Sequence, residues 1–213
     1  MQKYYVLLFV FISLNSLGQE RRFELWNKTQ FSVEPWENIS IDVSEKLHYS
    51  TQNSELSLKY GDIFIGHDIL NWLEYGAGFR VSYVKLEEGG WLQENRPMLF
   101  VNLDKDFDKI EFDFYNRFEY RSYKDVKNYF RYRQSLRMKL PALTGWGLQF
   151  YLQEESFIKL NGYGTHLARF YSGLTAYEKE HFELKIYYAL QKQEVQSNWL
   201  TSDIVGLNLS FEI

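Results

Sequence analysis

Hydrophobic and polar residues alternate along most of this chain with a period of two. The alternation is clearest between Asp108 and Leu140, where a polar break at Ser122–Asp125 separates two runs. In both runs large apolar side chains occupy every second position, and arginines and carboxylates occupy most positions between them. Successive side chains leave a β-strand on opposite sides, so the pattern predicts a long hairpin with one apolar face and one charged face.

The same alternation recurs from Ile39 to the C-terminus. It predicts about ten strands, within a range of roughly eight to twelve, and most are near the ~9–11 residues that a tilted strand needs to cross a bilayer. No segment of useful length has a helical period, which excludes an α/β enzyme. The predicted fold is all-β, an antiparallel up-and-down transmembrane β-barrel. Residues 20–38 alternate weakly and are either a first strand or a segment packed inside the barrel.

The predicted connections alternate between short and long. Outer-membrane barrels place short turns on the periplasmic side and long loops outside, so this alternation predicts that the C-terminus lies in the periplasm. A loop that contains Gly89 and Gly90 is expected over Glu87–Asn95. Short turns are expected after Val33, Leu103, Leu140 and Tyr177, and longer loops after Lys85, Ile158 and Lys192.

Residues 1–19 have the pattern of a secretory signal peptide. Lys3 supplies a positive start, Tyr4–Leu14 is an apolar run, and Ser16–Gln19 ends it with small and polar residues. An uncleaved membrane anchor is the alternative, although the apolar run is short for a bilayer span. The chain is therefore divided into a signal peptide (1–19), an N-terminal segment (20–38) and a barrel domain (39–213).

Composition narrows the possible functions. Aromatic residues make up 19% of the 213 residues, which favours strands, and the net charge of -4 argues against nucleic acid as a partner. The chain has no cysteine, which excludes a disulfide framework, a thiolate metal site, a cysteine nucleophile and an N-terminal lipid anchor. No cofactor is expected, and the length fits one domain or one barrel, which we expect to be a monomer.

Four groups of residues resemble motifs of a known family: Asn116–Arg121, Arg131–Arg133, Glu155 with Phe157, and Arg169–Leu174. From Phe23 to the C-terminus the chain is similar to the uncharacterised outer-membrane β-barrels of the domain-of-unknown-function family numbered 2490. The resemblance implies a porin-like barrel in the outer membrane of a diderm bacterium, surrounded by lipid and lipopolysaccharide. It implies no reaction and no ligand. Gly206, Leu209 and Phe211 also resemble the terminal-strand signal read by barrel-assembly machinery, which is thus an expected partner during biogenesis.

A ladder of charges on the inner face of the predicted barrel is the main candidate site. Guanidinium groups bind carboxylate and phosphate in a bidentate manner, so the ladder predicts an anion-binding lumen. The alternative is a structural plug, in which arginines and carboxylates pair with one another and fill a narrow barrel. The ladder consists of Arg80, Arg117, Glu119, Arg121, Arg131, Arg133, Arg137, Glu155 and Arg169.

Patterns for catalysis or metal binding are weak. The four histidines do not stand at metal-ligand spacing, and the sequence has neither a phosphate-binding loop nor a Gly-x-Ser-x-Gly motif. His166 with Ser156 or Ser172 suggests a lipid-facing hydrolase, but no spacing rule supports the pair. No catalytic residue and no metal ligand are therefore predicted.

The sequence thus predicts a non-enzymatic outer-membrane barrel with a structural role in the envelope, or one that binds or passes a small polar or anionic molecule. Two alternatives stay open: a membrane-embedded lipid hydrolase or acyltransferase, and a soluble periplasmic barrel with an apolar cavity, like a lipocalin. Alternation alone does not say which face points inward. The signal peptide, the aromatic residues at strand ends and the unequal loops favour an apolar face that points outward.

Overall fold

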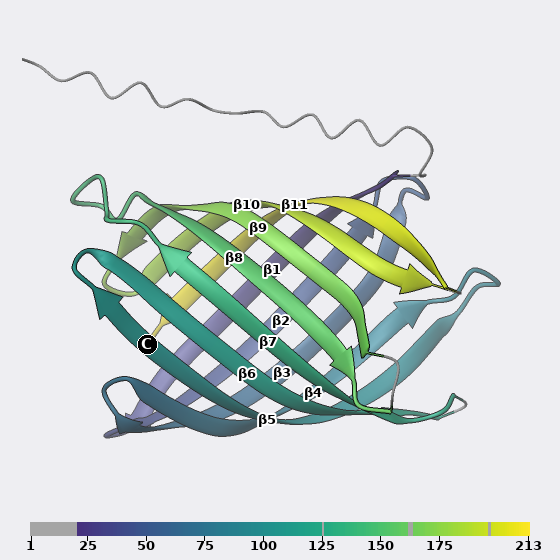
Figure 1. Cartoon of the computed structure of the whole chain (residues 1–213), viewed down its shortest axis with the longest axis horizontal. Helices are drawn as coiled ribbons and strands as arrows, with labels where there is room; N and C mark the ends of the chain where they lie inside the picture. The colour runs from purple at the N-terminus through teal and green to yellow at the C-terminus, as the bar shows by residue number, and fades with distance from the viewer. Residues whose placement is uncertain (1–20, 125, 162–163, 196) are drawn as a thin grey trace, which may run out of the picture.

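The computed structural model describes residues 21–124, 126–161, 164–195 and 197–213, and within them the chain is a closed barrel (Figure 1). These residues form eleven strands and no helix, so the predicted all-β barrel is confirmed. The described ranges hold no helix of the length and apolarity that a membrane span requires. The signal peptide predicted for residues 1–19 lies outside the described residues. The strands are β1 (Arg21–Trp36), β2 (Ile39–Ser50), β3 (Glu55–Leu70), β4 (Leu73–Lys85), β5 (Trp91–Phe107), β6 (Ile110–Tyr123), β7 (Tyr129–Lys139), β8 (Gln149–Lys159), β9 (Gly164–Lys179), β10 (Phe182–Val195) and β11 (Asn198–Glu212).

Neighbouring strands are antiparallel except in the pair that closes the barrel. There β1 and β11 run in parallel, with Arg21 opposite Thr201 and Phe31 opposite Phe211. Residues 21–36, for which the sequence left two possibilities, are thus a strand of the wall. Because the number of strands is odd, β1 starts and β11 finishes at opposite ends of the barrel (Figure 1). We call these ends the N-terminal rim and the C-terminal rim.

Two-residue turns dominate the C-terminal rim. They cover 37–38, 71–72, 108–109 and 180–181, so the turns predicted after Val33, Leu103 and Tyr177 occur a few residues later than expected. The connections at the N-terminal rim include 51–54 and 86–90 and are mostly longer. The longer loop predicted after Lys192 is wrong, because β10 continues to Val195 and β11 begins only three residues later.

The connection between β7 and β8 is the exception at the C-terminal rim. It covers 140–148, so the prediction of a short turn after Leu140 is wrong. The segment folds back on itself, with the N–H of Leu143 donating to the carbonyl of Leu148 at 2.8 Å. It also packs on the end of β9, since the N–H of Glu178 donates to the carbonyl of Trp146 at 2.9 Å. The backbone hydrogen bonds thus make this long connection an ordered structure.

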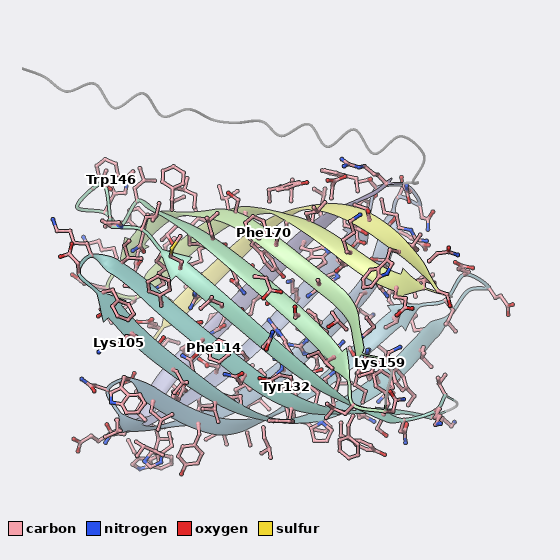
Figure 2. The ribbon with its side chains drawn as sticks, viewed as in Figure 1. Lys105, Phe114, Tyr132, Trp146, Lys159 and Phe170 are labelled. Atoms are coloured by element: carbon pink, nitrogen blue, oxygen red, sulfur yellow. The ribbon has the colours of Figure 1, made fainter. Side chains whose placement is uncertain are left out.

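Apolar side chains cover the outer face of the wall, and charged side chains line the inner face (Figure 2). In β6 the outward Phe114 and Phe118 are 37% and 55% exposed, whereas the inward Arg117 is 3% exposed. Large exposed aromatic side chains also gather near both rims. They are Trp36, Trp72, Phe107, Trp146 and Tyr177 at the C-terminal rim, and Phe23, Tyr49, Trp91, Phe130 and Trp199 at the N-terminal rim.

Candidate functional site in the lumen

The lumen contains a cavity of about 820 Å³, lined by side chains from all eleven strands. A small barrel usually fills its interior with inward side chains, so the open space needs an explanation. One reason for the open space is that large tyrosine rings lie flat along the wall.

Two tyrosines lie against the wall because glycines face them on the neighbouring strand. Tyr151 is paired in register with Gly173, and Tyr187 with Gly206. A Cβ atom on Gly173 would lie 2.2 Å from Cζ of Tyr151, and one on Gly206 would lie 2.0 Å from Cζ of Tyr187. Since glycine has no side chain, each ring occupies the space above it and does not extend toward the barrel axis. These close contacts help to keep the lumen open.

Glu119 on β6 pairs with three arginines, more than any other carboxylate among the described ion pairs, and only 1% of its surface is exposed. Arg117 approaches its Oε1 with Nε at 2.7 Å and Nη2 at 2.5 Å. Arg131 approaches its Oε2 with Nε at 2.7 Å and Nη2 at 2.5 Å, and Nη1 of Arg96 lies 3.6 Å from the same oxygen. Three guanidinium groups thus share one buried carboxylate through short, charge-assisted contacts.

Glu94 and Asp62 take part in three further ion pairs of this kind. Glu94 on β5 is fully buried and accepts hydrogen bonds from Nε of Arg96 at 2.7 Å and from Nη2 of Arg121 at 2.6 Å. Asp62 on β3 accepts a hydrogen bond from Nε of Arg80 at 2.9 Å. Arg96 therefore bridges Glu94 and Glu119 and joins their two clusters.

Glu155 on β8 forms a second centre across β7 to β9. It pairs with Arg133 of β7, and Nη1 of Arg169 lies 3.4 Å from its Oε2. The hydroxyl of Tyr171 donates to the same Oε2 at 2.9 Å. In contrast, Nε of Arg133 is buried and has no hydrogen-bond partner. The lumen therefore contains a guanidinium donor that its own carboxylates do not use.

Positive charge exceeds negative charge in this part of the lumen. Seven arginines contact four carboxylates, which leaves an excess of three positive charges. Ion pairing within the wall is therefore incomplete, and the field inside the cavity favours an anion. The arginines are Arg80, Arg96, Arg117, Arg121, Arg131, Arg133 and Arg169, and the carboxylates are Asp62, Glu94, Glu119 and Glu155.

Lys28 and Lys46 add to this excess. Both line the cavity from β1 and β2, and neither forms an ion pair within the described ranges. Nζ of Lys28 donates to Oε1 of Gln30 at 2.6 Å, and Nζ of Lys46 lies 4.1 Å from the centre of the Trp26 ring. The guanidinium of Arg169 lies 4.8 Å from the same ring. Two cationic groups from opposite parts of the wall thus meet at one indole.

The structure places all nine ladder residues predicted from the sequence on the inner face. Eight of them belong to the network around Asp62, Glu94, Glu119 and Glu155, whereas Arg137 lies apart and pairs with Asp113 at 3.0 Å. Sequence reasoning missed Glu94 and Arg96. Glu94 falls in the expected loop Glu87–Asn95, but β5 already begins at Trp91. The alternation of Glu94, Arg96 and Met98 could have revealed this strand.

The histidine and serine pair considered for a hydrolase is not assembled. His166 is 6% exposed and lies near a strand irregularity between Phe157 and Ile158, whereas the hydroxyl of Ser156 donates to Glu154 on the outer face. Within the described ranges no hydrogen bond joins His166 to Ser156 or Ser172. The same ranges hold no group of three or more His, Cys, Asp or Glu side chains that could bind a metal ion.

Comparison with known proteins gives one match. The family model described as a protein of unknown function (DUF2490) matches residues 23–201. No curated protein and no solved structure matches the chain.

Proposed function

Since this chain belongs to the family of proteins of unknown function DUF2490, whose description names no activity, we propose a function from the lumen itself. The protein is an outer-membrane β-barrel that binds a small anionic molecule in its lumen, without a chemical reaction. The observation that carries this proposal is the excess of positive charge around the cavity.

The outer face supports a membrane location. A closed barrel pairs the backbone groups of every strand, and only such a structure or a helix can satisfy them in hydrocarbon. Exposed aromatic side chains at both rims correspond to the girdles that flank the apolar band of outer-membrane barrels. A soluble barrel with an apolar cavity has the opposite arrangement, with its apolar side chains inside.

The turn lengths support an orientation. Four two-residue turns lie at the C-terminal rim, and outer-membrane barrels have their short turns in the periplasm. In this orientation the C-terminal rim faces the periplasm and the N-terminal rim faces outward. The connection over 140–148 is then a periplasmic feature.

The arginine network supports anion binding. Guanidinium groups favour carboxylate and phosphate, and a cavity of about 820 Å³ is within the usual range for small-molecule sites. The ion pairs hold the arginines in place, which lowers the entropy that an anion would otherwise have to remove on binding.

Titration calorimetry with pyrophosphate and citrate tests the proposal, using full-length protein folded in a neutral detergent. We expect saturable binding that weakens with added salt, and a loss of about tenfold in affinity in Lys46→Gln. Lys59→Gln is the matched control, because Lys59 lies near the Trp91 ring, 4.7 Å from its centre, and is absent from the cavity lining. Absence of binding for both anions would overturn the proposal and leave the ion pairs as a structural filling.

A further inference from the structure

The lumen near the C-terminal rim carries charge of the opposite sign. Asp42 on β2 and Glu74 on β4 line the same cavity as the arginine network. Asp42 accepts hydrogen bonds from the hydroxyl of Ser32 at 2.5 Å and from the amide of Gln30 at 3.2 Å, and Glu74 accepts one from Ser40 at 3.3 Å. All three donors are neutral, and neither carboxylate forms an ion pair in the part of the chain that the structure describes.

Three inward cations near this rim do not neutralise the two carboxylates, because each already pairs with another carboxylate. Arg137 pairs with Asp113 at 3.0 Å, Lys139 with Glu111 at 3.0 Å, and Lys185 with Glu183 at 2.6 Å. The lumen is therefore polarised along its axis. Unpaired negative charge lies toward the C-terminal rim, and unpaired positive charge lies deeper, at Lys46, whereas Lys28 is joined to Asp42 through the side chain of Gln30.

A buried amide oxygen beside Glu74 provides an independent indication of a bound donor group. Oδ1 of Asn102 is buried without a hydrogen-bond partner, and Asn102 lines the cavity and is paired in register with Glu74. The amide nitrogen of Asn102 donates to Oδ2 of Asp104 at 2.9 Å, which fixes the amide so that its oxygen is the free atom. A buried acceptor without a donor is unfavourable, and an ammonium group of a bound molecule would satisfy it.

The strand geometry gives the separation between the two charged regions. Asp42 and Lys46 lie on the same strand and the same face, four positions apart. At about 3.3 Å per residue, their Cα atoms are about 13 Å apart. An extended peptide spans at most about 3.3–3.6 Å per residue, so a tetrapeptide has a comparable length.

We propose that the lumen binds a zwitterion whose ends are about 13 Å apart, of the class of a short peptide with free termini. Its amino group lies between Asp42 and Glu74, and its carboxylate lies beside Lys46 and Arg133, whose Nε has no hydrogen-bond partner. This inference rests on the proposed anion-binding function, which it makes more specific. It places the carboxylate end in the deeper part of the cavity.

Three forms of one peptide separate the two ends. Tetra-alanine carries both charges, its N-acetylated form carries only the carboxylate, and its C-terminal amide carries only the amine. Calorimetry with the folded full-length protein should show that tetra-alanine binds about tenfold or more tightly than either capped form.

Two substitutions assign the ends of the peptide. Glu74→Gln should lower the affinity for tetra-alanine about tenfold and leave the affinity for the acetylated form unchanged. Lys46→Gln should lower the affinity for both peptides. Asp42→Asn gives a second probe of the amino end, and Glu154→Gln on the outer face is the control that should change neither. Retention of heat-modifiable mobility on a gel shows that each variant is folded.

The outcomes distinguish this inference from the proposal beneath it. If tetra-alanine and its acetylated form bind equally and pyrophosphate also binds, the ligand is not recognised as a zwitterion, and the proposed anion binding still stands. Equal binding of tetra-alanine and its amide would overturn the assigned carboxylate end. If neither the peptides nor pyrophosphate and citrate bind, both the inference and the proposed function fail.

Discussion

At the scale of the residue, Glu119 shows how the wall holds its arginines. The carboxylate is the only counter-charge that Arg117 and Arg131 contact among the described ion pairs, and all three side chains are buried. Glu119→Gln keeps the shape and removes the charge, which leaves two buried guanidinium groups unpaired. We expect a loss of about 3–5 kcal/mol in the free energy of unfolding, the usual effect of breaking a buried pair. Urea unfolding from lipid vesicles measures it.

Glu154→Gln is the matched control for that measurement. Glu154 lies one position before Glu155 on β8, but on the outer face, where it accepts a hydrogen bond from Ser156 at 2.5 Å. Glu154→Gln should lower the free energy of unfolding by much less than Glu119→Gln does. A loss in Glu119→Gln that does not exceed the loss in the control would mean that water or neighbouring carboxylates already compensate the arginines.

At the scale of the element, β8 and β9 show how packing between strands sets the size of the lumen. Gly173→Ala places a methyl group within 2.2 Å of the Tyr151 ring, which has to swing toward the axis. We expect a loss of about 1–3 kcal/mol in the free energy of unfolding, as for other overpacked sites, and weaker binding of pyrophosphate. Gly61→Ala is the control, because its nearest neighbour would be the Ser44 carbonyl oxygen at 3.8 Å. If the two variants unfold alike, the ring is not held by the glycine.

The elements also show what could be predicted from the sequence. Strict alternation in β6 and β7 is a local property, so their faces and the ladder residues on them could be assigned. In β1 both faces mix polar and large apolar residues, as Trp26 beside Lys28 on the inner face shows, so the periodicity is weak. Ion pairs between neighbouring strands, such as Arg121 with Glu94, depend on strand register and cannot be read from spacing. The excess of positive charge therefore became visible only in the assembled barrel.

At the scale of the whole molecule, neighbouring residues on β7 test the membrane location. Leu136 is 46% exposed on the outer face, and Leu136→Arg should lower the free energy of unfolding by about 2–4 kcal/mol if the barrel lies in a bilayer. Arg137→Leu leaves Asp113 without its partner at 3.0 Å, near water at the rim, so we expect a smaller loss. Unfolding in urea from vesicles and from lipid-free buffer compares the two. Cooperative folding of the parent protein without lipid or detergent, with Arg137→Leu silent, would contradict the membrane location.

The opposite positions of the two chain ends give a second test at this scale. With the C-terminal rim in the periplasm, an epitope placed directly before Arg21 should emerge at the N-terminal rim, on the cell surface. Antibody labelling of intact cells should detect this epitope and should miss one placed after Ile213. If only the C-terminal epitope is labelled, the orientation is the opposite one, and the rim with short turns lies outside.

The parallel pairing of β1 with β11 has a consequence for how the barrel is made. All other neighbouring strands are consecutive and can form as hairpins, but Arg21 and Thr201 are separated by 180 residues. Pairs that are distant in sequence form slowly, because a long stretch of chain must first be ordered between them. Until β1 and β11 pair, the sheet keeps two open edges, which can pair with other chains. A folding factor that shields both edges is therefore needed most at this last step, when β1 still lacks its partner strand.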